Sequence, residues 1–198
     1  MKTTPYEKLA LHKLQSTLNS YIESSVSSFS KLIHEPVRQH FSRFVDTEIS
    51  KLEFLIPEIL GDVFAVYIRC EGDLRLGMMF FLPEAESKNL AAHLLKKQQK
   101  NLTELGRSSI AELGNIMTGS FLTALSNETG LHIQASVAGS SIDTLRSLMQ
   151  PSVSYIAQSS ERIIVGISEL KTRSGIILYF IVTLDPHEIK KILAKAGS

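Results

Sequence analysis

The stretch LTELGRSSIAELGNIMTGSFLTALSNETG, from Leu102 to Gly130, reads as one long amphipathic helix. At about 100° per residue, its apolar side chains form one stripe that we expect to face a core. The members of this stripe are Ile110, Leu113, Met117, Phe121 and Ala124. Nearly opposite the stripe, Ser108, Glu112, Asn115 and Gly119 fall within a narrow sector, and we expect them to face outward together.

Asparagine and glycine both destabilise the interior of a helix. The asparagine amide competes for backbone hydrogen bonds, and glycine costs about 1 kcal/mol relative to alanine. Gly106, Gly114 and Gly119 therefore indicate close approach of other backbone, and Gly119 would leave the surface beside Asn115 open to a partner. The spacing of Glu112 and Asn115 alone is a weak signal, because ordinary solvated side chains also produce it.

The residues around this pair resemble the CheC/CheX/FliY family of chemotaxis phosphatases. The family signature is Asp or Ser, three residues, Glu, two residues, then Asn, and here Ser108, Glu112 and Asn115 occupy those positions. The segment ELGNIMTGSFLTALSNETGL, residues 112–131, also resembles the CheC form of this helix.

The family is built on an internal repeat, and the resemblance places the first copy of the signature helix at Leu14–Val37. Asn19 then falls on the asparagine position, Ser16 on the glutamate position and His12 four residues earlier. Because this copy lacks the glutamate, we interpret Ser16, Asn19 and His12 as an exposed polar face of a degenerate first site.

Composition limits the broad class of protein. The chain has 198 residues, 43% hydrophobic and 21% charged, with a formal net charge of +1, which gives no broad electrostatic reason to expect nucleic acid or a membrane as partner. No apolar run approaches the roughly 20 residues of a membrane span, and no signal peptide is evident, so we expect a cytoplasmic protein. The single Cys70 reads as a small buried apolar side chain, and no spacing suggests a bound metal.

Each half of the chain shows the same order of elements, namely helix, strand, hairpin and helix. In the first half we expect a helix at about 6–33, a strand at 37–45, a hairpin of 62–70 and 74–82, and a helix at 83–97. In the second half we expect the helix at 102–130, a strand at 131–139, a short helical piece at 142–149, a hairpin of about 152–170 and 175–184, and a last helix at 185–196. Asp185 is the expected N-cap of that helix, with Pro186 at its first position.

This doubling predicts an α+β fold of one domain, residues 1–198, with repeat halves of about 6–100 and 101–198. The resemblance further implies that the hairpins join in one continuous antiparallel sheet with pseudo-twofold symmetry. It also implies that the two long signature helices lie side by side on one face of that sheet.

Glu112 and Asn115 cannot form a complete hydrolase by themselves, because the sequence shows no nucleophile, no phosphate-binding glycine loop and no metal-ligand set. The resemblance implies that the substrate is a phosphorylated CheY-type response regulator, which carries its own Mg²⁺ and lysine beside the aspartyl phosphate, so the chain needs no cofactor of its own. Asn115 would then position the attacking water and Glu112 would pair with the regulator, with Ser108 and Gly119 in supporting roles.

Other functions stay open at this stage. The chain could be a non-catalytic module that binds or sequesters a phosphorylated receiver domain, or that docks the receptor deamidase CheD, which some CheC relatives bind. A flagellar switch component of FliY type ranks third, because those relatives carry additional segments. His93 and His132 stand isolated on their expected elements, which is typical of structural histidines.

Overall fold

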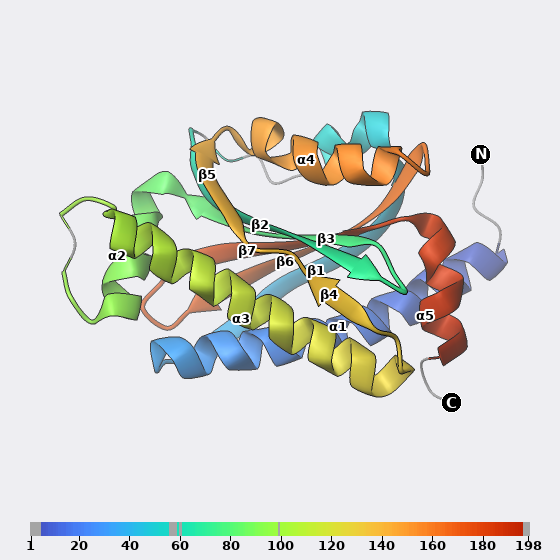
Figure 1. Ribbon diagram of the computed structural model, residues 1–198, viewed down its shortest axis with the longest axis horizontal. Helices are drawn as coiled ribbons and strands as arrows, with labels where there is room; N and C mark the ends of the chain where they lie inside the picture. Colours follow the sequence, from blue (N-terminus) through green and yellow to red (C-terminus); the bar gives the residue numbers. More distant parts are fainter. Residues whose placement is uncertain (1–4, 56–58, 60, 99, 196–198) are drawn as a thin grey trace.

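The computed structural model describes residues 5–55, 59, 61–98 and 100–195. Its helices cover both faces of one twisted sheet (Figure 1). The helices are α1 (Pro5–Ile33), α2 (Glu84–Leu95), α3 (Glu104–Thr129), α4 (Leu145–Ala157) and α5 (Ile189–Lys195), with short 3₁₀ helices η1 (Ile49–Phe54) and η2 (Pro186–Glu188). The strands are β1 (Val37–Glu48), β2 (Val63–Gly72), β3 (Leu76–Pro83), β4 (Ile133–Ala135), β5 (Gly139–Asp143), β6 (Arg162–Thr172) and β7 (Ile177–Leu184).

The two halves of the chain contribute their strands to the sheet in a symmetric order. From either edge of the sheet, a strand from one half is followed by the hairpin of the other half. The strands follow the path β1-β6-β7-β3-β2-β4, with β5 also paired to β2, and every pairing is antiparallel. The two hairpins meet at β3 and β7, and each hairpin binds the single strand that comes from the other half of the chain. This arrangement confirms the α+β fold with one continuous antiparallel sheet and pseudo-twofold symmetry.

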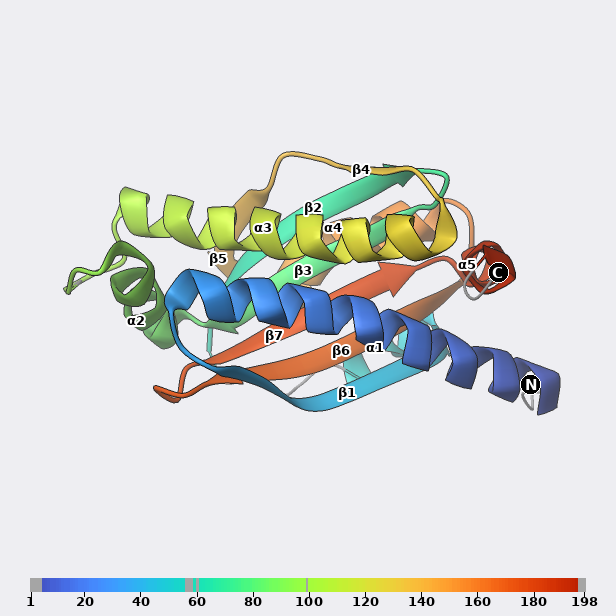
Figure 2. The same ribbon diagram turned by 90° about the horizontal axis from the view of Figure 1, so that it is seen from below.

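The long helices α1 and α3 lie side by side on one face of the sheet (Figure 2). Their contact is made partly by small polar side chains. The Ser25 hydroxyl donates to the Met117 carbonyl at 2.7 Å, and the Ser28 and Ser120 hydroxyls are 2.6 Å apart. Below them, the ring of Phe121 meets the ring of Tyr21 edge-on, at a centroid distance of 5.6 Å. The predicted pair of signature helices is therefore confirmed.

The apolar stripe of α3 faces the core as predicted. Ile110, Leu113, Met117 and Phe121 are buried, and Ala124 is half-buried against the same cluster.

The three glycines of α3 differ in their surroundings. A Cβ at Gly114 would lie 2.8 Å from Val66 Cγ1 on β2, and one at Gly106 would lie 3.1 Å from the Ala91 Cβ. These neighbours are side chains rather than the backbone we expected. A Cβ at Gly119 would meet no atom within 4 Å, so the surface there is open.

The segment after β5 differs from the prediction. A single helix, α4, spans Leu145–Ala157. The expected short helix at 142–149 is therefore the beginning of a longer one, whereas the expected strand from 152 is wrong, because the hairpin begins only at Arg162. Pro151 lies inside α4, where a proline costs roughly 3 kcal/mol. Leu145, Met149 and Ile156 recur at helical spacing and are buried on the second face of the sheet, contributing about 1.5–3 kcal/mol each. Their burial outweighs the proline.

Other boundaries follow the sequence more closely. The expected strand at 131–139 is divided into β4 and β5, which both pair with β2. Ala135 is opposite Cys70 and Gly139 is opposite Tyr67, so the three residues 136–138 lie opposite only two residues of β2 and the regular ladder is interrupted. Asp185 is the predicted N-cap, accepting from the His187 N–H at 2.9 Å, with Pro186 next to it. Within the described part of the chain, no helix has the length and apolarity required to cross a membrane.

Two matched alanine substitutions test the packing of α3. Gly119→Ala should raise the free energy of unfolding by about 0.5–1 kcal/mol, because alanine favours the helix and meets no neighbour. Gly114→Ala should lower it by about 1–2 kcal/mol, because overlap with Val66 exceeds the same helical gain. Urea unfolding monitored by circular dichroism measures both. Equal stabilisation by the two substitutions would contradict the close packing at Gly114.

Candidate functional site

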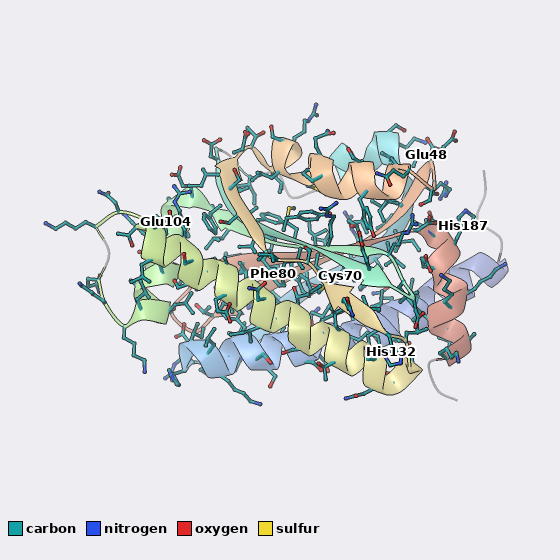
Figure 3. The ribbon with its side chains drawn as sticks, in the orientation of Figure 1. Glu48, Cys70, Phe80, Glu104, His132 and His187 are labelled. Atoms are coloured by element: carbon teal, nitrogen blue, oxygen red, sulfur yellow. The ribbon has the colours of Figure 1, made fainter. Side chains whose placement is uncertain are left out.

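The candidate site lies on the outer face of α3. Thr103 caps the helix by accepting the Gly106 N–H at 3.1 Å, and Gly130 ends it in a left-handed conformation with φ of 68°. Figure 3 shows Glu104 at the beginning of the helix and His132 just beyond its end. Between them, all four predicted residues are exposed: Ser108, Glu112, Asn115 and Gly119. The predicted outward face is confirmed.

Glu112 and Asn115 contact each other. The Asn115 Nδ2 donates to Glu112 Oε2 at 3.2 Å. Among the described residues, neither side chain has another polar partner. This hydrogen bond orients the carboxamide and leaves Asn115 Oδ1 as an unoccupied acceptor at the surface. The second carboxylate oxygen of Glu112 is also available, so the pair can bind one water and one cation from outside.

The same spacing occurs a second time, on α2. Asn89 Nδ2 donates to Glu86 Oε2 at 3.0 Å, again across three residues of a helix. The internal geometry of Glu112 and Asn115 is therefore not distinctive by itself. Their surroundings distinguish them, because Gly119 leaves open space one turn after Asn115 and a groove begins there.

This groove runs between α1 and α3 and has a volume of about 760 Å³. Most of its lining side chains are small or polar, and Glu23 and Lys31 contribute one charge of each sign. The lining residues are Ser20, Glu23, Ser24, Ser27, Ser28 and Lys31 on α1, and Ile116, Gly119, Ser120, Thr123, Ala124 and Asn127 on α3. We did not predict its α1 wall, although the closely spaced serines of that helix were a visible signal.

The first copy of the signature is arranged differently. Ser16 and His12 are exposed as predicted, but Asn19 is half-buried, so its predicted exposure is wrong. Its Oδ1 accepts from the Ser42 hydroxyl of β1 at 2.6 Å, and Ser42 in turn accepts from buried Ser168 at 3.2 Å. Asn19 points toward the sheet because β1 offers it this donor. In the first copy, the asparagine therefore holds a strand rather than facing a partner.

Three other candidate residues, His93, His132 and Cys70, make contacts within the fold. His93 is not isolated, because its Nε2 lies 3.7 Å from Glu35 Oε1. His132 is exposed near the end of β2, and its backbone N–H donates to Asp73 Oδ2 at 2.8 Å. Burial raises the pKa of the Cys70 thiol to about 12, so it stays protonated at neutral pH, as expected for a core residue. Across the described ranges, no group of three His, Cys, Asp or Glu side chains could hold a metal ion.

The chain is similar in sequence to known proteins over a region that includes most of α3. The model of the CheC-like family matches residues 105–137, which cover most of α3 and the chain through β4. Over 140 residues, the chain is 29% identical to the CheY-P phosphatase CheC of Bacillus subtilis (strain 168), covering 64% of this chain and 67% of that protein.

Solved structures share the fold. The chain matches FliY of Thermotoga maritima with a TM-score of 0.73 and 16% identity, covering 98% of both chains. It matches the CheX of a CheX–CheY–BeF3–Mg²⁺ complex from Borrelia burgdorferi with a TM-score of 0.58 and 12% identity, covering 84% of this chain and 96% of that one. These comparisons confirm the resemblance to the CheC/CheX/FliY family.

Alanine substitutions test whether Asn19, unlike Asn115, stabilises the fold. Asn19→Ala should lower the free energy of unfolding by about 1–3 kcal/mol, because the Ser42 hydroxyl loses its acceptor in a partly buried place. Asn115→Ala should change it by no more than about 0.5 kcal/mol, because that side chain is exposed. Urea unfolding measures the difference. Equal effects would contradict the structural role of Asn19.

Proposed function

We propose, from this resemblance to the CheC/CheX/FliY family, that the protein hydrolyses the aspartyl phosphate of a CheY-type response regulator. The observation that carries the proposal is the exposed Glu112–Asn115 pair on the signature helix, with open space at Gly119 beside it. A relative that is 29% identical is a CheY-P phosphatase, and its match spans 64% of this chain. The substrate is therefore another protein, and the catalytic centre is completed when the two dock.

Asn115 positions the attacking water. Its Nδ2 is held by Glu112, so its Oδ1 accepts a hydrogen bond from a water and holds it in line with the acyl phosphate. The water oxygen forms the new bond to phosphorus while the bond from phosphorus to the aspartyl oxygen breaks. The products are inorganic phosphate, which keeps the water's oxygen, and the free aspartate of the regulator. Such a reaction gains mainly from positioning and electrostatic stabilisation.

Glu112 fixes the position of the regulator. Its carboxylate pairs with the active-site lysine of the regulator through the oxygen that Asn115 leaves free. Ser108, one turn earlier, and Gly119, one turn later, belong to the contact surface, where Gly119 lets the loops of the regulator approach closely.

The regulator supplies the metal in this scheme. Mg²⁺ held by the regulator beside its aspartyl phosphate would neutralise the charge that develops on the phosphoryl oxygens. A solved structure that shares this fold is a complex of CheX with CheY, BeF3 and Mg²⁺. The protein itself contributes Asn115 and Glu112.

A second candidate function is a non-catalytic module that binds or sequesters a phosphorylated receiver domain, or that docks CheD. The hydrogen bond of Asn19 to Ser42 favours it, because one copy of the signature already serves the fold instead of a partner. The lifetime of the phosphorylated regulator separates the two functions. A phosphatase shortens this lifetime, whereas a sequestering module lengthens it or leaves it unchanged.

Substituting Asn115 tests the water-positioning role. Receiver domains from the source organism are phosphorylated with acetyl phosphate, and phosphate release is measured with each purified variant. Asn115→Ala should slow release by about a hundredfold, because misplaced reacting groups cost this much. Asn89→Ala is the matched control, since Asn89 makes the same hydrogen bond on α2, and it should retain full activity. An Asn115→Ala protein as active as the original would exclude the role.

Substituting Glu112 tests the docking role. Glu112→Ala should raise the regulator concentration needed for half-maximal rate by about tenfold or more, because the lysine of the regulator loses its partner in the interface. The rate at saturation should fall less than it does in Asn115→Ala. A concentration series of phosphorylated regulator measures both quantities. If Ser16→Ala and Asn19→Ala abolish turnover while Glu112→Ala does not, the working site lies in the first copy.

A further inference from the structure

A hollow lined by basic residues lies where α1 joins β1 and where β6 turns into β7. Its lining residues are Pro36, Arg38 and His40 from the first of these segments, and Lys171, Thr172 and Arg173 from the second. We call this site the basic hollow. Its volume is about 480 Å³, within the range of small-molecule sites. Figure 2 shows the α1–β1 connection and the β6–β7 turn at the same end of the molecule. None of its residues belongs to the Glu112–Asn115 site.

The basic hollow brings like charges together. Arg38 and Lys171 are direct partners in the antiparallel ladder of β1 and β6. Like charges in such positions destabilise a sheet. In the described part of the chain, the side chains of Arg38, Lys171 and Arg173 form no ion pair and no hydrogen bond. An anion bound between them would relieve this repulsion.

Among the described residues, no carboxylate lines the basic hollow. Glu35 precedes Pro36, but its oxygens accept from the Ser174 hydroxyl at 2.6 Å and lie 3.7 Å from His93. Glu169, two residues before Lys171 on β6, lies beside Tyr179 and contributes to raising the pKa of that phenol, after burial as the main cause. Glu23 on α1 lines a neighbouring hollow that also contains Arg38 and His40.

The walls of the basic hollow are held in place by hydrogen bonds. The Arg173 N–H donates to the Pro36 carbonyl at 3.0 Å, which ties the β6–β7 turn to the α1–β1 connection. The Ser174 N–H donates to Glu35 at 3.2 Å, and the Ile176 N–H donates to the Thr172 hydroxyl at 3.0 Å. Because these bonds fix the backbone beforehand, a ligand would not have to order it.

We propose that the basic hollow binds a compact oxyanion with several charges, either inorganic pyrophosphate or the oligophosphate group of a small metabolite. Two arginines, a lysine and an imidazole match a phosphate group, which forms strong charge-assisted hydrogen bonds with arginine and lysine. Among the described side chains, His40 is the only aromatic group that lines the hollow, so we expect a base or ring attached to the phosphates to lie outside.

Titration of the full chain with sodium pyrophosphate at low salt, followed by calorimetry, tests this proposal. We expect saturable binding of one pyrophosphate per chain, which weakens as salt is added. Arg38→Gln/Lys171→Gln should reduce the affinity at least about tenfold, because two charge-assisted contacts are lost. Arg173→Gln is a second variant, placed in the turn outside the strand ladder, and should reduce the affinity at least about threefold.

The control variant is Lys13→Gln/Lys190→Gln. It also removes two positive charges, but from exposed positions on α1 and α5, and it should bind pyrophosphate with the affinity of the original protein. A parallel titration with ATP identifies the source of the anion. Affinity equal to that of pyrophosphate indicates a metabolite, and much weaker binding indicates the free anion. The proposal is overturned if pyrophosphate does not saturate, if the control loses as much affinity as the variants, or if an oligoglutamate peptide binds more tightly than pyrophosphate.

Discussion

The pairing of β3 with β7 at the centre of the sheet determines the rest of the structure. Phe80 and Phe180 are direct partners in this pair, and their rings stack at a centroid distance of 4.5 Å. This pairing joins the two hairpins and leaves β6 and β2 at their outer edges, where β6 binds β1 and β2 binds β4 and β5. Both long helices then lie on one face, where Phe121 of α3 packs edge-on against Phe180 at 6.1 Å. Once Phe121 faces inward, helical geometry turns Glu112 and Asn115 outward.

The two copies of the signature helix have taken different roles within this symmetric frame. Asn19 accepts a hydrogen bond from β1 and is half-buried. Within the described part of the chain, the Asn115 side chain hydrogen-bonds only to Glu112, and it faces outward. The same residue type therefore stabilises a strand in one copy and stays available in the other. In our proposal, stability and recognition are divided between the copies, so a substitution in one should leave the role of the other intact.

Local sequence patterns predicted the features that depend on neighbours in the chain. The apolar period of α3 gave its inner stripe and its outer face, and the turn residues Glu71–Asp73 gave the β2–β3 hairpin. The missed features depend on residues far apart in sequence. The partners of Asn19 and His93 lie on other elements, and the basic hollow combines β1 with the end of β6. The helix through Pro151 was missed because its stabilisation comes from packing on the sheet.

The most direct test of the central claim is to map where a phosphorylated regulator touches this protein. The chain is labelled with ¹⁵N and titrated with a CheY-type receiver domain carrying BeF3 and Mg²⁺, and the amide signals are followed by NMR. Docking on the outer face of α3 predicts that the Asn115 side-chain amide and the Gly119 backbone amide shift most, while the Asn89 side chain stays unchanged. Shifts confined to other surfaces, with Asn115 and Gly119 unaffected, would contradict the claim that this helix completes the catalytic centre of the regulator.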